Sequence, residues 1–347
     1  MSFLPDMGVL PIKLGWGVFS FFSPRELLSF SNLSLYLLLI ILLYFLARRT
    51  GRRSEGGIRA FLLPSRLWKS PSAQLDVRYY LIIQPFFVLM IAPVVAWMQW
   101  SSGGVLQLCE QLFGLSPFPL NPTIGRAIYT LTVFLAIDFG FFYSHYLTHK
   151  YPALWCFHKV HHSAEVLVPF TALRFHPLDA LWNVMFSACF VGILGGVCRY
   201  LFLPDATQFS LFGNHIIVAL SYLTTHNLRH SHIWLNYPAW LTRWLISPAQ
   251  HQLHHSCEAR HIDKNFGYLL PFWDRWMGTS YVPVEQETFR LGIAHMPESG
   301  LRAHHSIQSL LLAPFLELAD LWRNRQQGTI DEREPSPLKN PEQKTGF

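Results

Sequence analysis

The side chains of this chain best suited to chemistry are histidines, and they are concentrated in one stretch. Of the 17 histidines, 14 lie between His145 and His261, a segment of about a third of the chain where even spacing would place only about six. Ten of these form four short clusters: His145 and His149; His158, His161 and His162; His226 and His230; and His251, His254 and His255. Residues three or four apart share one face of a helix, so each cluster presents its imidazoles in one direction.

Such a constellation is typical of a metal centre. Neutral imidazole is a ligand suited to iron, zinc, copper or nickel, and one ring binds one ion at about 2 Å. Ten rings exceed the needs of a single ion, so we expect two metal ions with about four to six ligands each. A single histidine near a membrane is more often a packing residue, but four clusters at helical spacing argue against a purely structural role. The other histidines are expected behind the ligands or at the surface.

The elements that position these clusters are predicted to be membrane helices. Hydrophobic residues make up 51% of the chain and charged residues 14%, with a mean hydropathy of +0.23, whereas soluble domains carry about 25% charged residues. The net charge of +6 would ordinarily favour nucleic acid, but the basic residues flank apolar stretches, so we expect no nucleic-acid partner. Five cysteines without a C-x-x-C pair argue against a disulfide framework or a cysteine-based zinc site.

Several apolar stretches are candidates to cross the hydrocarbon core, which needs about 20 helical residues. They are residues 30–47, 79–100, 127–143, 182–203 and 209–225. The last two are expected to form a hairpin that returns the chain to its starting side. The loop between the first two carries eight basic residues against two acidic ones, so the positive-inside rule makes it cytoplasmic. This topology places every histidine cluster on the cytoplasmic face.

The predicted fold is all-α: an integral-membrane helical bundle of about four transmembrane helices, or five, and a cytoplasmic helical cap that carries a histidine-rich dimetal site. We divide the chain into an N-terminal membrane region over 1–126, a catalytic domain over 127–280 and a C-terminal segment over 281–347. Residues 8–23 are expected to form a membrane-surface or re-entrant helix without a secretory signal, and the polar tail from Arg323 to be disordered.

The residues around the clusters resemble the sterol desaturase / fatty acid hydroxylase superfamily. The resemblance covers about residues 127–280, and it is specific because the order, spacing and connecting residues of several motifs agree together. The motifs are YSHYLTHKYP from Tyr143, WCFHKVHHS from Trp155, LRFHP from Leu173, SPAQHQLHHS from Ser247, DKNFG from Asp263 and WDRWMGT from Trp273. One departure is Tyr146, because the family commonly has arginine after the first histidine.

The resemblance implies an integral-membrane, non-haem di-iron enzyme that uses O2 and two electrons to hydroxylate or desaturate a lipid. Zinc could substitute for iron. The ligands it implies are His145, His149, His158, His161, His162, His230, His251, His254 and His255, together with His226, which is the least secure of the ten.

Further residues are expected to support the ligands. Asp138 shares a helical stripe with His145, and a carboxylate within a membrane is costly unless it faces a polar interior, so we expect it to accept a hydrogen bond from a ligand histidine of a neighbouring helix. Arg174 and Asn265 are expected to organise the cytoplasmic cap. Further candidates for this supporting role are His176, His232 and Asp263. Helix capping or loop salt bridges are the simpler expectation for Glu165, Asp179, Asp263 and Asp274.

The sequence also limits the reaction. Breaking an unactivated C–H bond needs a redox metal and oxygen. No dinucleotide fingerprint is present, and His176-Pro177 continues as Leu178 rather than as a cytochrome b5 haem motif. We therefore expect a separate electron donor at the cytoplasmic face, of the ferredoxin or cytochrome b5 type, and a lipid substrate that arrives from the bilayer. The membrane would be the inner membrane of a bacterium or the endoplasmic reticulum of a eukaryote.

Several alternatives stay open at this point. Hydroxylation and desaturation begin with the same hydrogen abstraction, and sterol, fatty acyl, carotenoid and ether-lipid substrates all fit. A zinc-dependent membrane hydrolase would need a base such as the glutamate of H-E-x-x-H, and no glutamate lies between the paired histidines. A metal transporter would need ligands near the bilayer midplane, and here the clusters lie beyond the span ends.

Overall fold

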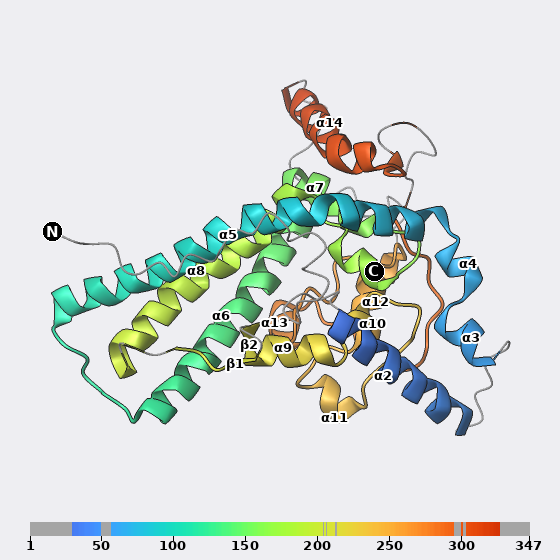
Figure 1. Ribbon diagram of the computed structural model, residues 1–347. Helices are drawn as coiled ribbons and strands as arrows, with labels where there is room; N and C mark the ends of the chain where they lie inside the picture. The colour runs from blue at the N-terminus through green and yellow to red at the C-terminus, as the bar shows by residue number, and fades with distance from the viewer. Residues whose placement is uncertain are drawn as a thin grey trace, which may run out of the picture.

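The computed structural model describes residues 30–49, 57–203, 205, 207–211, 214–294, 300 and 303–326, which are mostly helical (Figure 1). The helix expected over residues 8–23 lies outside these residues. The residues after 326 also lie outside them. The disordered tail was expected to begin at Arg323, but helix α14 spans Ile307–Gln326 and so includes Arg323.

Three long apolar helices are candidates to cross a membrane. They are α5 (Pro71–Phe113), α6 (Pro122–Lys150) and α8 (Pro177–Phe202), and α8 packs between the other two (Figure 1). Each begins with proline at its first position, where the missing N–H is not needed. Leu89–Phe113 of α5 and the whole of α6 and α8 are long and apolar enough to cross a membrane.

Among the described residues, three helices are long and apolar enough to cross a membrane, whereas four or five spans were expected. Residues 209–225 contain the two-stranded hairpin of β1 (Ser210–Leu211) and β2 (Asn214–His215), followed by the short helix α9 (Ile216–Leu223). Eight helical residues extend about 12 Å, well short of the hydrocarbon core. Hydrogen bonds to Thr130 hold this hairpin against α6.

The first expected span also differs from the prediction. Helix α2 covers Phe30–Arg49, but its apolar part, Asn32–Leu46, is shorter than the three long helices. It packs against α9 and the short helix α10 (His226–Arg229). The second expected span lies within α5, which continues to Phe113 despite the internal prolines Pro85 and Pro93.

Short helices gather around the end of α6 that carries His145 and His149 (Figure 1). Beside α10, the elements of this cap are α7 (Pro152–His162), the 3₁₀ helix η2 (Pro169–Leu173), α12 (Pro248–His254), the 3₁₀ helix η3 (Ala259–His261) and α13 (Phe272–Met277). Helix α14 packs on α7, and three further short helices are α3 (Gly57–Leu62), α4 (Ser65–Trp68) and α11 (Ala239–Thr242).

Helices α6 and α8 approach most closely at Gly140. A Cβ atom there would lie 2.6 Å from Cα of Ser187 and 2.9 Å from its Oγ, too close for any real contact. Because backbone atoms of α8 cannot move away cheaply, only glycine allows this separation. This close contact helps to position the cap, because α6 carries two of the clustered histidines and α8 packs against α7.

We predict that Gly140→Ala destabilises the protein by about 1–3 kcal/mol, because the added methyl group overpacks the α6–α8 contact. Thermal unfolding in detergent measures the change. Gly104→Ala is the matched control: nothing lies within 4 Å of its added Cβ, and alanine favours a helix over glycine by up to about 1 kcal/mol. Equal midpoints for the two variants would contradict the packing argument.

Candidate metal centre

The structure brings nine of the ten clustered histidines into two groups. The first group holds His145 and His149 from the end of α6, His158 and His162 from α7, and His254 from α12. One ring nitrogen from each of the five lies within 4.8 Å of the others. Four of the five side chains are buried, so the group is closed to water on most sides.

The second group holds His161, His230, His251 and His255, and the side chains of His161, His230 and His255 are buried. Their Nε2 atoms converge: His230 lies 3.3 Å from His161, 3.1 Å from His255 and 3.1 Å from His251, and His251 lies 3.3 Å from His255. About 3 Å is the separation of two nitrogens that occupy neighbouring positions on one ion at about 2.0–2.1 Å.

The short helices α7 and α12 each contribute histidines to both groups, so the two groups lie next to each other. On α7, His158 and His162 are four residues apart and share a face, while His161 turns toward the second group. On α12, the chain likewise sends His254 to the first group and His251 to the second. The rings of His162 and His255, one from each group, are 4.7 Å apart between centroids.

Hydrogen bonds to Nδ1 orient the rings of the first group. His158 Nδ1 lies 2.9 Å from Asp179 Oδ2, His145 Nδ1 lies 3.0 Å from the Phe266 carbonyl, and His254 Nδ1 lies 2.7 Å from the Lys264 carbonyl. Each acceptor fixes the proton on Nδ1 and leaves Nε2 as the free base. The Nε2 atoms of all five histidines are buried without a hydrogen-bond partner among the described residues.

These features fit metal ions. Burial, followed by the charges of neighbouring histidines, holds the pKa of His161, His162 and His254 well below the usual value, and burial lowers the pKa of His255 to about 3. The rings are therefore neutral, which is the form that binds a metal. Lone pairs of converging Nε2 atoms repel one another unless a cation lies between them, so both groups could hold an ion.

His226 is not part of either group. Its ring instead contacts Tyr222 and Tyr268, with centroids 5.1 Å and 5.7 Å away. The reason is the short helix α10, on which His226 begins the first turn and His230 caps the end, so the two rings do not share the face that i, i+4 spacing gives a longer helix. The position of His226 therefore does not support the expectation that it is a metal ligand.

Asp138 is fully buried, but it does not contact a histidine as expected. Its carboxylate accepts hydrogen bonds from the backbone N–H groups of Leu269 and Leu270 and from Nε1 of Trp273. The segment after Phe266 lies against α6 at that level and occupies the carboxylate. Asp138 thereby holds the segment whose Phe266 carbonyl meets His145.

Two other expected supporting residues lie near the groups. Asp263 Oδ1 is 3.6 Å from His149 Nδ1, and its Oδ2 accepts a hydrogen bond from Lys150. Asn265 links its side-chain amide to the carbonyls of Gln250 and Tyr281 and accepts from the Tyr281 N–H, which ties α12 to the following loop. Both residues adopt positive φ angles, 58° and 59°.

His176 and His232 have structural positions away from the groups. His176 caps α8, because its Nδ1 accepts from the Leu178 N–H, and its Nε2 lies 3.2 Å from the Leu311 carbonyl. His232 Nε2 lies 2.7 Å from the Phe61 carbonyl. Each ring connects the cap to a neighbouring helix and contacts no ligand histidine.

Sequence reasoning did not single out the three acceptors that orient the first group. Asp179 was a possible partner of a ligand, with helix capping or a loop salt bridge favoured, and it accepts from His158, 21 residues earlier. The other two acceptors are backbone carbonyls, which carry no sequence signal. The DKNFG motif does contain both carbonyl residues, Lys264 and Phe266, so its position after the last cluster was the available hint.

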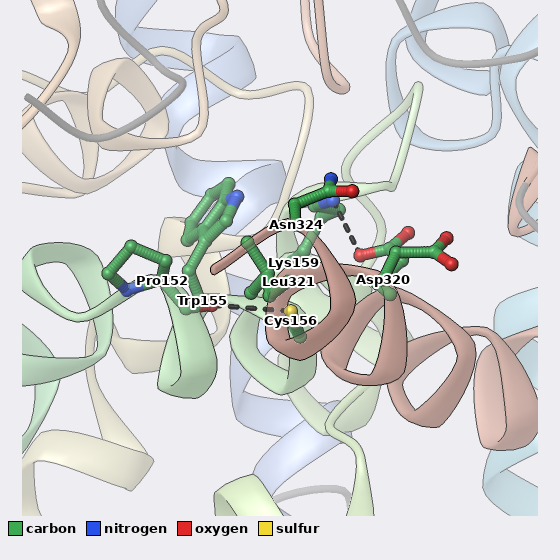
Figure 2. A pocket seen from close by; sticks show the side chains of 8 residues that line it. Pro152, Trp155, Cys156, Lys159, Asp320, Leu321 and Asn324 are labelled. Carbon is green, nitrogen blue, oxygen red and sulfur yellow. Dashed lines mark hydrogen bonds and ion pairs between the residues drawn. The ribbon is translucent and has the colours of Figure 1, made fainter. Parts of the chain in front are cut away.

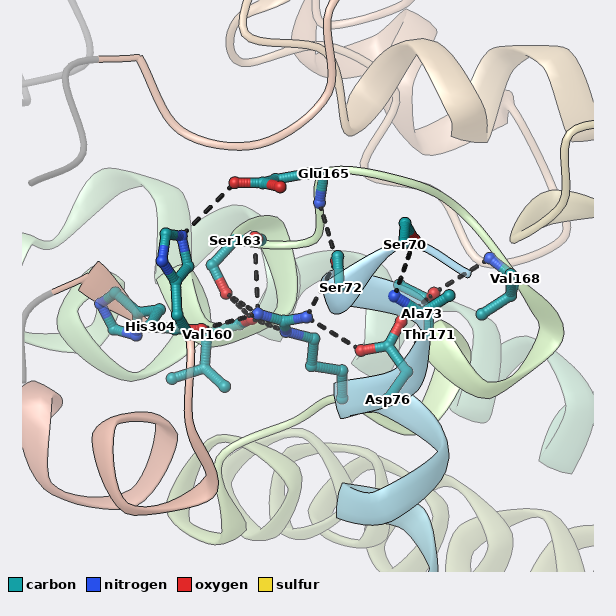
Figure 3. A network of polar contacts seen from close by, with 12 residues as sticks. Ser70, Ser72, Ala73, Asp76, Val160, Ser163, Glu165, Val168, Thr171 and His304 are labelled. Carbon is teal, nitrogen blue, oxygen red and sulfur yellow. Dashed lines mark hydrogen bonds and ion pairs between the residues drawn. The ribbon is translucent and has the colours of Figure 1, made fainter. Parts of the chain in front are cut away.

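Arg174 was expected to organise the cap, and it lies at the centre of a buried polar network whose members Asp76, Val160 and Ser163 are labelled in Figure 3. It is 1% exposed, pairs with the equally buried Asp76 at 2.9 Å, and donates to Ser163 Oγ and to the carbonyls of Val160 and His304. Burial raises the pKa of Asp76, and the guanidinium opposes that shift. One side chain thus joins α5, the end of α7 and the segment before α14.

Trp155 closes the first group on its outer side. Its ring is 5% exposed and lies 4.9 Å from His149 and 5.4 Å from His162 between centroids. Trp155 also lines a hollow between α7 and α14, across which Lys159 and Glu317 form an ion pair of 2.6 Å (Figure 2). No clustered histidine lines this hollow, so Trp155 separates it from the histidines.

Comparison with known proteins identifies the class. Residues 130–279 match the fatty acid hydroxylase family. The match covers less than half of the chain, and it confirms the resemblance to the sterol desaturase / fatty acid hydroxylase superfamily.

Individual relatives agree with this family. The chain is 29% identical to human alkylglycerol monooxygenase over 47% of its own length and 33% of the relative. It is 28% identical to an ornithine lipid hydroxylase of Rhizobium tropici, over 48% and 46% of the two chains, and 28% identical to a Delta(7)-sterol 5(6)-desaturase of Gibberella zeae, over 50% and 49%. The matches thus span a third to a half of these relatives. No solved structure matches significantly.

We predict that Asp179→Asn weakens metal binding about 10–100-fold, because an amide is a poorer acceptor for the His158 Nδ1 proton and no longer fixes the ring. Metal content after dialysis against graded chelator measures the loss. Glu285→Gln, which removes an exposed carboxylate, is the control and should bind like the unaltered chain. Retention of metal by Asp179→Asn would show that this hydrogen bond does not tune the site.

We predict that Arg174→Met destabilises the protein by about 3–5 kcal/mol, because it leaves the Asp76 carboxylate buried without its partner. The double variant Arg174→Met with Asp76→Leu should recover part of that loss, since no buried charge then remains unpaired. Thermal unfolding of the three proteins forms the comparison. A double variant less stable than the single one would contradict the charge argument.

Proposed function

We propose that this chain is a membrane-bound di-iron oxidoreductase that uses O2 and external electrons to hydroxylate or desaturate a lipid. The observation that carries the proposal is the pair of adjoining histidine groups, five and four rings, with their free nitrogens directed toward one another. Iron bound there would supply the redox chemistry that an unactivated C–H bond requires and that no protein side chain offers.

The residues of the chain have three tasks in this proposal. The nine histidines hold the ions in a neutral, mostly buried ligand set, while Asp179 and the carbonyls of Phe266 and Lys264 orient three of the rings. Trp155 and the cap exclude water. Helix α6 connects the site to the bilayer, because the same helix is apolar along its length and ends in His145 and His149.

A lipid substrate is supported by the relatives and by the apolar helices. The relatives named above act, by their names, on alkylglycerols, ornithine lipids and sterols. They favour a lipid without choosing its class. The electrons would come from a separate donor of the ferredoxin or cytochrome b5 type at the cytoplasmic face, and the catalytic domain would cover residues 127–280.

The composition of the two groups favours this reaction over the alternatives. Both groups consist of histidines alone, so a zinc hydrolase built on them would have no carboxylate base among its ligands. The histidines come from the end of α6 and from the cap, rather than from the middle of the apolar helices where a transporter binds its ion.

The test combines metal analysis with lipid mass spectrometry. The purified full chain is expected to hold about two irons, and cells that express it should contain a lipid that has gained one oxygen or lost two hydrogens, only when O2 is supplied. His149→Ala and His255→Ala, one from each group, should lose metal and product, while the exposed His305→Gln keeps both. A single zinc with hydrolysis or ion flux would overturn the proposal.

A further inference from the structure

Arg229 is a buried cation without a carboxylate partner among the described residues. It is 3% exposed, and the ion pairs found in the described part of the chain do not include it. Its Nη1 donates to the Tyr268 carbonyl, and its Cζ lies 5.9 Å from the centre of the Tyr268 ring. Its Nε is also buried and has no hydrogen-bond partner there.

Asp138 is the carboxylate whose charge acts on Arg229, and its oxygens are already occupied by other hydrogen bonds. Asp138 raises the pKa of Arg229, against the larger effect of burial, but its oxygens accept from Leu269, Leu270 and Trp273. An arginine remains charged in a protein, and a buried charge is costly unless it is paired. The unpaired Nε is therefore available to an oxygen atom from outside the chain.

His226 stands beside Arg229 on the same short helix. The two residues are three positions apart on α10, and His226 Nδ1 is likewise buried without a partner among the described residues. Tyr222 and Tyr268 flank the His226 ring. Tyr268 contacts both side chains, since its ring lies 5.7 Å from the His226 ring and 5.9 Å from Arg229 Cζ. His226 and Arg229 therefore form one polar patch with an aromatic border.

The patch adjoins the second histidine group. Arg229 precedes His230 directly in the chain, and His230 belongs to the second histidine group. A group bound at Arg229 would therefore lie beside the candidate metal site.

An apolar approach leads to the same place. Helix α9 is hydrophobic, exposes 49% of Leu220, and ends three residues before His226. Helix α2, also apolar, packs against both α9 and α10 (Figure 1). A chain of methylene groups could lie along these helices while its polar end meets the patch.

We propose that Arg229 and His226 bind the oxyanion of an acidic lipid, a carboxylate or a phosphate, and thereby set which carbon meets the histidine groups. This rests on the proposed function and narrows its substrate class. The oxidised carbon lies near the acidic end of the lipid, because Arg229 and His230 are neighbours. His226 is then a substrate-positioning residue in place of a ligand.

The test is equilibrium binding of three probes with the same hydrocarbon chain: hexadecanoate, hexadecyl phosphate and hexadecanol. The full chain is used in nanodiscs of zwitterionic lipid, both iron-loaded and metal-free. We expect one of the acidic probes to bind at least about 10-fold more tightly than the alcohol, and the preferred one identifies carboxylate or phosphate as the natural group. Arg229→Gln should remove this preference, and Arg229→Lys should keep part of it.

Arg66→Gln is the matched control, because it removes one positive charge from an exposed position on α4. It should leave the preference unchanged. Equal binding of all three probes by the unaltered chain would overturn the proposal, whatever the variants do. A similar loss in Arg66→Gln and Arg229→Gln would also overturn it, since the preference would then reflect surface charge.

Iron content and O2-dependent lipid oxidation are measured on the same samples. Loss of the acidic preference in Arg229→Gln with normal iron content supports a role in binding rather than in the metal site. A preference for acidic probes in a chain that holds no iron and oxidises no lipid would refute the proposed function and leave the binding site standing. Oxidation of lipid without any preference would refute the binding site alone.

Discussion

The constraint on which the structure depends is the burial of nine imidazoles with their basic nitrogens facing one another. Such an arrangement is unfavourable by itself, because burial removes water from each ring and neighbouring lone pairs repel. The pKa values of His161, His162 and His254 fall for this reason, so the rings stay neutral. Metal ions would convert the repulsion into attraction, and the rest of the cap can be understood as what keeps the rings in place.

The cap is held by charged side chains that are themselves buried and paired. Arg174 and Asp76 connect α5 to the end of α7. Asp138 and Asp274 hold the segment that begins at Phe266: the first accepts from Leu269, Leu270 and Trp273, and the second accepts from the N–H groups of Phe266 and Gly267. Asp138, which was expected to accept a hydrogen bond from a ligand histidine, therefore acts one step further away, through the backbone that presents a carbonyl to His145.

The site lies where an apolar helix ends, and this position connects lipid chemistry to the fold. Helix α6 is long and apolar enough to cross a membrane, and it ends in two histidines of the first group. On the other side, α9 ends at the patch of His226 and Arg229, next to the second group. In the proposed function, a lipid that enters between these helices would meet a cation and two histidine groups, so the geometry that would position the metals would also limit which lipids react.

The sequence by itself determined the family and the residues that converge. Spacing of three and four residues and the connecting motifs identified the histidines, since helical periodicity is a local property that the order of residues encodes. It kept His226 among the ligands as the least secure of the ten, because i, i+4 spacing is informative only on a helix longer than α10. Tertiary structure alone decided how the rings divide between two groups, that Asp179 rather than Asp138 meets a histidine, and that 209–225 folds as a hairpin and a short helix. These outcomes depend on contacts between residues far apart in the chain, such as those of Thr130 with Phe209 and His215, which hydrophobicity within a window cannot reveal.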